Sequence, residues 1–132
     1  MKMKNIEVIN TLQTLAALAE KRLPVKVSYA VARNISELQK ISADIEKERQ
    51  KLIQEYAVLG DDGKPRTKKN EDGQDAYELR DEAAYKEEYV QLLEAENDFE
   101  PHYISEAELE SQSDRYDVLT VAEMMSLAFM IQ

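Results

Sequence analysis

Cysteine is missing from this 132-residue sequence, and histidine occurs only once, as His102. Without cysteine there are no disulfides, thiolate metal sites or cysteine nucleophiles, so stability must come from packing. With one histidine, a metal site made of several histidines is excluded, and a catalytic triad has only one available base. Because His102 stands beside Tyr103 in a segment expected to be extended, a packing or surface role is favoured over a catalytic one.

Glycine is scarce, and its three positions are isolated from one another. The phosphate-binding patterns GxxxxGKS, GxxxxGKT and GxGxxG are therefore absent. Two Asp-Gly pairs, at Gly63 and Gly73, suggest calcium-binding loops. However, aligning Gly73 with the invariant glycine of an EF-hand places Lys68 at the first ligand position and Leu79 at the bidentate glutamate position, and aligning Gly63 places Val58 first. Neither alignment fits a calcium loop.

Glu78 and Glu82, four residues apart on an expected helix, form a carboxylate pair with suitable spacing for a divalent ion. The same spacing arises by chance in a helix this acidic, and a hard cation demands more oxygen ligands than two residues supply. The sequence therefore predicts no catalytic residue, no metal and no cofactor.

Long apolar runs are lacking as well. No stretch approaches the roughly 18 apolar residues of a membrane span, and the N-terminal MKMKNIEVIN lacks the continuous apolar segment of a signal peptide. We therefore expect no membrane association and a cytoplasmic protein.

Negative charge is in excess, and it is unevenly placed. The net charge is −10. Residues 1–60 contain 10 Lys+Arg against 7 Asp+Glu, whereas residues 61–132 contain 7 against 20. The acidic half repels nucleic acid and attracts basic protein surfaces, so direct nucleic-acid binding is not expected. Two interpretations stay open: the charge keeps the protein soluble, or it mimics nucleic acid.

The length and the 43% apolar content predict a single domain over residues 1–132, mainly α. Its first part, residues 5–59, is expected to be a long helical hairpin. Asn5 is a plausible N-cap for the first helix, whose apolar positions recur every three or four residues at Ile9, Leu12, Ala16, Ala19 and Leu23. Pro24 then breaks the helix, which places Leu23 in the turn.

The stretch RLPVKVSYAVARN alternates apolar and polar residues like a strand from Val25 to Tyr29, but it also opens a much longer helical pattern. The longer pattern predicts a helix from about Pro24 or Ser28 to about Leu59, ended by Gly60. Its apolar residues recur every seven positions, at Val31, Leu38, Ile45 and Leu52. This stripe must be covered either by the chain's own helices or by a second copy of the chain, and its four residues are candidate partner-binding residues.

Residues 60–75, GDDGKPRTKKNEDGQD, predict a flexible loop or a short hairpin, with basic residues that are surrounded by acids. An acidic, α-rich module over residues 76–132 follows. Its first helix is expected from Ala76 to about Ala95, with an apolar face that consists of Tyr85, Tyr89, Leu92 and Leu93.

The end of the chain combines an extended segment with two short helices. Alternating aromatic residues around Pro101 predict an extended edge segment over residues 98–104. Capping boxes at Ser105 and Thr120 each predict a helix start. The last helix should dock on the core through Val121, Met124, Met125, Leu127, Ala128 and Ile131. Alternatively, Met124 and Met125 form an adaptable partner-binding surface.

Several of these segments occur together in a known group of proteins. The sequence contains LPVKVSYAVARNISELQ, then IEKERQKLIQEY, a DDGK-type turn, EYVQLL and ISEAEL. Over residues 5–131 this pattern resembles a family of small uncharacterised proteins that are encoded by bacteriophages and prophages of Gram-positive bacteria. The chain departs from that family in the acidic stretch of residues 110–119. The shared motifs concern packing and turns, so the resemblance implies an origin without a catalytic role.

We therefore expect a phage-derived, non-enzymatic protein that interacts with a phage or host protein or assists assembly. Its long helix either packs within the chain or self-associates with a second copy, and both alternatives stay open. The alternative is an acidic inhibitor that occupies the basic groove of a host nucleic-acid-processing enzyme. A carboxylate-metal enzyme is a third hypothesis, suggested only by the spacing of acidic residues.

Overall fold

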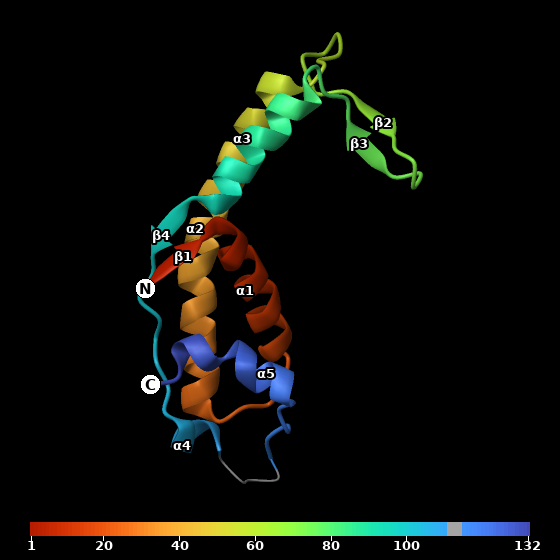
Figure 1. Ribbon diagram of the computed structural model, residues 1–132. Helices are drawn as coiled ribbons and strands as arrows, with labels where there is room; N and C mark the ends of the chain where they lie inside the picture. Colours follow the sequence, from red (N-terminus) through yellow and green to blue (C-terminus); the bar gives the residue numbers. More distant parts are fainter. Residues whose placement is uncertain (111–114) are drawn as a thin grey trace. The chain divides into compact units, whose positions relative to one another are not determined.

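The protein is mainly α, with short strands between its helices. A computed structural model describes residues 1–110 and 115–132 (Figure 1). The described elements, in chain order, are β1 (Lys2–Lys4), α1 (Asn5–Leu18), α2 (Val25–Tyr56), β2 (Thr67–Lys69), β3 (Asp75–Tyr77), α3 (Glu82–Glu94), β4 (Glu96–Asp98), α4 (Glu106–Leu109), α5 (Val121–Ser126) and a 3₁₀ turn (Ala128–Met130). The expected long helix, third helix, extended segment and C-terminal helix are all present.

The chain divides into two compact units. The first unit consists of Met1–Ser42 and Glu96–Gln132, and the second consists of Ala43–Ala95. The helix α2 contributes residues 25–42 to the first unit and residues 43–56 to the second. Four residues of the divergent acidic stretch, 111–114, lie outside the described part of the chain.

The first unit has a core that draws on both ends of the chain. Helix α1 buries Val8, Leu15 and Leu18, and these side chains share the core with residues from α2 and from the C-terminal half, which are Val27, Val31, Leu38, Phe99, Ile104, Leu127 and Met130. Burial of a large apolar side chain contributes about 1.5–3 kcal/mol. The C-terminal segments are therefore part of the fold of the first unit.

Helix α1 differs from its prediction in length and in its buried face. It ends at Leu18, and Leu23 lies in the turn before Pro24 as expected. Ala16 and Ala19 are exposed, because the run of apolar residues in this helix is too broad for its spacing to identify one face. The predicted N-cap Asn5 is wrong: it is the first helical residue, and its buried side chain accepts a hydrogen bond from Asn97 Nδ2 at 2.7 Å.

Strand β1 was not predicted, and it explains why the N-terminus is ordered. It pairs antiparallel with β4, Met3 opposite Asn97, and Figure 1 shows the two strands side by side. The pairing continues beyond the strands, because the backbone N–H of Phe99 donates to Met1 O and the terminal amine donates to Phe99 O, both at 2.9 Å. The expected extended segment of residues 98–104 thus begins as a strand partner of the N-terminus.

Helix α2 settles the ambiguous stretch in favour of a helix. It begins at Val25, directly after Pro24, and the first bond runs from Ser28 N to Pro24 O at 2.9 Å. Proline at this position costs nothing, because the N–H that it lacks has no intrahelical acceptor. The helix ends at Tyr56, three residues before the expected end, since Val58 instead donates to Glu78 O at 2.7 Å.

The second unit contains a β-hairpin where a loop or short hairpin was expected. Strands β2 and β3 pair antiparallel, with Lys68 opposite Ala76. The tight turns on either side of β2 contain Gly63 and Gly73, both at φ 76°, a conformation that glycine adopts without strain. In the second turn Asn70 Oδ1 accepts hydrogen bonds from the backbone N–H groups of Asp72 and Gln74, both at 3.0 Å.

Helix α3 starts later than its prediction. Residues 76 and 77 belong to β3, because pairing with β2 satisfies their backbone groups. The helix begins after Asp81, whose side chain accepts from Ala84 N at 3.1 Å and caps it. Tyr85 stacks on Tyr89 with ring centroids 5.9 Å apart, and its other neighbour is Tyr56 at 6.3 Å, edge to face. The expected aromatic face is therefore present, although α3, which is fully described, contains no fully buried residue.

Candidate partner-binding site

Four exposed apolar side chains lie close together in sequence near the C-terminus. Val118 is 87% exposed, Val121 74%, Met125 72% and Met124 43%. We call these four residues the C-terminal apolar surface. Single exposed apolar residues are common on proteins, whereas exposed apolar residues that gather in one patch mark interaction sites, which makes these four residues a candidate surface.

This arrangement confirms part of the predicted docking face of the last helix, at Leu127 and Ile131, and corrects the rest. The helix docks on the core, but the side chains that dock are Leu127 and Met130, which are completely buried, together with the half-buried Ile131. The expected core residues Val121 and Met125 point to solvent instead. The physical reason is the short length of α5: it ends at Ser126, and the following 3₁₀ turn directs the later apolar residues inward.

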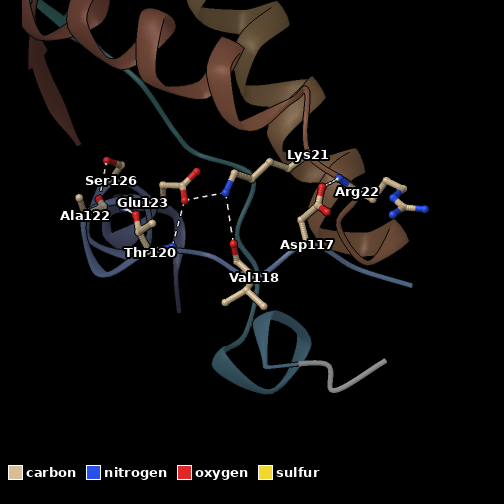
Figure 2. Close-up of polar contacts among 8 residues, drawn as sticks. All are labelled: Lys21, Arg22, Asp117, Val118, Thr120, Ala122, Glu123 and Ser126. Carbon is tan, nitrogen blue, oxygen red and sulfur yellow. Dashed lines mark hydrogen bonds and ion pairs between the residues drawn. The ribbon is translucent and has the colours of Figure 1, made fainter. Parts of the chain in front are cut away.

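Polar contacts hold the segment before α5 against the turn between α1 and α2 (Figure 2). Asp117 and Arg22 exchange two bonds: Arg22 N donates to Asp117 Oδ2 at 2.7 Å, and Asp117 N donates to Arg22 O at 2.8 Å. Lys21 Nζ donates to Val118 O at 3.2 Å and forms an ion pair with Glu123 Oε1 at 2.8 Å. The C-terminal apolar surface is therefore attached to a defined part of the fold.

Glu123, which forms the ion pair with Lys21, also caps the start of α5. Its Oε1 also accepts from Thr120 N at 3.0 Å, and Thr120 Oγ1 accepts from Glu123 N at 3.1 Å, which confirms the predicted capping box. The hydrogen bond from Lys21 is the main reason that the pKa of Glu123 lies below its usual value, and the Thr120 backbone N–H lowers it further. The charged form of Glu123 is thus the form that the fold favours.

This lowered pKa predicts a stability difference that depends on pH. Because the folded pKa of Glu123 lies below its unfolded value of about 4.3, the ionised side chain stabilises the fold above that pH, and the contribution disappears as pH falls through the folded pKa. Glu123→Gln should therefore lower the urea midpoint at pH 7, and the difference from the wild type should shrink between about pH 5 and pH 3. Urea unfolding measured by circular dichroism at several pH values checks this.

A matched control is Glu48→Gln, which removes an exposed pair with Lys51 inside one helix. Such pairs contribute little, so the control should leave the midpoint nearly unchanged at every pH. A pH-independent effect of Glu123→Gln would contradict the ion pair with Lys21.

The six candidate partner-binding residues differ in their exposure: some are buried and others lie on the surface. Val31, Leu38 and Ile45 are buried by the chain itself, which corrects their assignment as a partner surface. Leu52 is half-buried, and the fully buried neighbour is Ile53. An α-helix drifts by about 20° for each seven residues, so a strict seven-residue spacing leaves the buried face after three repeats. Met124 and Met125 are the two candidates that remain on the surface.

The other residues that the sequence analysis considered for metal binding or catalysis form ordinary structural contacts. Glu78 pairs with Arg66 at 3.7 Å and Glu82 pairs with Lys86 at 3.1 Å, so the two carboxylates each have a cation of their own. Within residues 1–110 and 115–132, no three acidic or histidine side chains are grouped to hold a metal ion. His102 is half-buried, and its backbone N–H and C=O are both hydrogen-bonded to the side chain of Asn34.

Sequence reasoning missed Asn34, the fully buried polar residue of α2. Its Oδ1 accepts from His102 N at 2.7 Å and its Nδ2 donates to His102 O at 3.1 Å, so one side chain satisfies both backbone groups of a residue in the extended segment. Its Nδ2 also lies 3.4 Å from Met130 Sδ. The available signal was a polar residue inside an apolar stripe, between Val31 and Leu38.

Comparison with known proteins adds no relative: no family model, no curated protein and no solved structure matches this chain. Within the described residues, none of the helices combines the length and the apolar character that crossing a bilayer requires.

Proposed function

We propose that this chain is a phage-derived, non-enzymatic protein that binds a protein partner through its C-terminal apolar surface. The observation that carries the proposal is the exposure of Val118, Val121 and Met125 on a segment that polar contacts fix to the fold. Leaving these side chains in water forgoes about 25 cal/mol for each Å² of apolar surface that a partner would cover. The phage origin rests on the sequence resemblance over residues 5–131.

Methionine suits such a surface because its flexible, polarizable side chain adapts to different apolar shapes. Met124 and Met125 follow Val121 on α5, so the surface combines rigid and adaptable side chains. A partner that presents an apolar groove or helix face of similar size fits this arrangement.

The test is recovery of a specific partner from bacterial cells in which a related phage or prophage is active. The tagged wild type is compared with Val121→Ser and Met125→Ser. The expected result is a protein that the wild type recovers and that both variants lose by at least about tenfold, as removal of well-buried interface contacts predicts. Val90→Ser, at an exposed valine of α3, is the control and should recover the same protein. A partner retained by both surface variants would contradict the proposed site, and specific turnover by the purified protein would contradict the proposed class.

An acidic inhibitor is the second candidate function. It is supported by exposed carboxylates, including Glu87 on α3 and Glu106 on α4, for which the described part of the chain contains no ion pair. Such a protein competes with DNA for a basic groove, and the competition weakens as salt screens the charges. Failure of the protein to displace DNA from any captured nucleic-acid enzyme at low salt would exclude this function.

A further inference from the structure

A groove of about 500 Å³ lies within the first unit, away from the C-terminal apolar surface. One wall is an exposed face of α2, and the other is the extended segment Asp98–His102. Its volume falls in the range of small-molecule sites, about 300–1,000 Å³.

Both walls of the groove contribute apolar residues, and the second wall is held in place. Phe99 and Pro101 are buried, and Ile41 is half-buried. Asn34 fixes both backbone groups of His102, and the N-terminal strand fixes Phe99. The groove is therefore shaped before any ligand enters, which lowers the cost of binding.

Most charged side chains around the groove already have partners. Glu37 pairs with Lys40 at 3.2 Å, and Asp98 pairs with Lys2 at 2.7 Å. Glu100 lies 4.0 Å from the terminal amine. These contacts neutralise the three carboxylates of the groove.

Arg33 is the exception. Within residues 1–110 and 115–132 no carboxylate forms an ion pair with it; its guanidinium lies over the ring of Tyr29, 5.5 Å from the centroid. Contact with an aromatic face orients a guanidinium and leaves its N–H edges available. Such a planar fork matches a carboxylate, with which it forms two parallel hydrogen bonds.

We propose that the groove binds a small organic acid with one carboxylate and an apolar body. The carboxylate pairs with Arg33, and the apolar part covers Ile41 and Pro101. A doubly charged phosphate fits less well, because among the described residues Arg33 is the one charged side chain of the groove without an ion pair and balances a single negative charge, while Lys40 is already paired with Glu37.

The probe for a first test is 4-phenylbutyrate, titrated into ¹⁵N-labelled protein at pH 7 and followed by amide chemical shifts. For a ligand of this size we expect saturable shifts around Arg33, Ile41 and Phe99 and a dissociation constant on the order of 1–10 mM. The neutral 4-phenylbutyramide and the dianionic phenyl phosphate should each bind at least about fivefold more weakly, since the amide lacks the charge that pairs with Arg33 and the phosphate carries a second charge for which the described residues of the groove offer no unpaired cation.

Arg33→Ala should weaken 4-phenylbutyrate binding at least about tenfold, because it removes a charge-assisted hydrogen-bond pair. The matched control is Lys26→Ala, which removes the same charge from another exposed position of α2 and should leave binding unchanged. The proposal is overturned if no saturable shifts occur, if the amide or the phosphate binds as tightly, or if Lys26→Ala weakens binding as much as Arg33→Ala.

Discussion

Ile45→Asp is expected to unfold the protein. Ile45 is 6% exposed on α2, so the substitution removes apolar burial and places a carboxylate among apolar side chains. The expected loss is about 4 kcal/mol or more, out of a total stability of about 5–15 kcal/mol for an ordinary domain. Because the chain itself covers Ile45, the expected outcome is loss of helical circular dichroism and not dissociation into folded chains.

The control for this substitution lies on the same helix. Val25 is 76% exposed in the first turn of α2, where a carboxylate also interacts favourably with the helix dipole. Val25→Asp should therefore change the free energy of unfolding by no more than about 0.5 kcal/mol. If Ile45→Asp keeps the wild-type urea midpoint and molecular mass, the assignment of Ile45 to a packed seam is wrong.

The success of the helix prediction came from periodicity that extends over many residues. The pattern around Val31, Leu38 and Ile45 outweighed five alternating residues, and the structure confirms one continuous α2 from Val25 to Tyr56. The capping residues Ser105 and Thr120 were also predicted correctly, because a cap depends on atoms three residues away. Features that depend on nearby residues, such as helix periodicity and these caps, can therefore be predicted from a single sequence.

Features that depend on partners far away in the sequence were not predicted. Strand β1 is three residues long and finds its partner β4 more than 90 positions later, so neither strand has enough alternating residues to be recognised. The start of α3 was placed too early for a more local reason: Ala76 and Tyr77 continue the helical pattern, but they pair with β2, about ten residues earlier, in a hairpin whose strands are too short to be recognised.

The C-terminal apolar surface was likewise predicted only in part. Composition singled out Met124 and Met125, and both are exposed. The sequence correctly placed Leu127 in the core, but it did not reveal that Met130 docks while Val121 and Met125 stay exposed, because that depends on where α5 ends and the 3₁₀ turn begins. The contacts of Lys21 with Glu123 and Val118 likewise join residues about 100 positions apart, so no local sequence pattern predicts them.

Asn34→Leu is the second substitution with a large expected effect. It keeps a side chain of similar length at a fully buried position but leaves the part-buried N–H and C=O of His102 without their partner. A buried polar group without a hydrogen bond costs about 1–3 kcal/mol, so the expected loss of stability for the two groups is about 2–4 kcal/mol after the added apolar burial is allowed for. Asn10→Leu makes the same chemical change at an exposed position of α1 and should have little effect.

Amide hydrogen exchange under native conditions distinguishes this role from general destabilisation. The N–H of His102 bonds to Asn34, whereas the N–H of Phe99, three residues earlier, bonds to Met1 O. In Asn34→Leu the His102 amide should exchange much faster while the Phe99 amide loses only the protection that reflects the lower global stability. Equal acceleration at both amides would mean that Asn34 contributes only to packing. Selective acceleration at His102 would mean that one buried amide positions the wall of the groove, and the same variant should then weaken 4-phenylbutyrate binding although it leaves Arg33 in place.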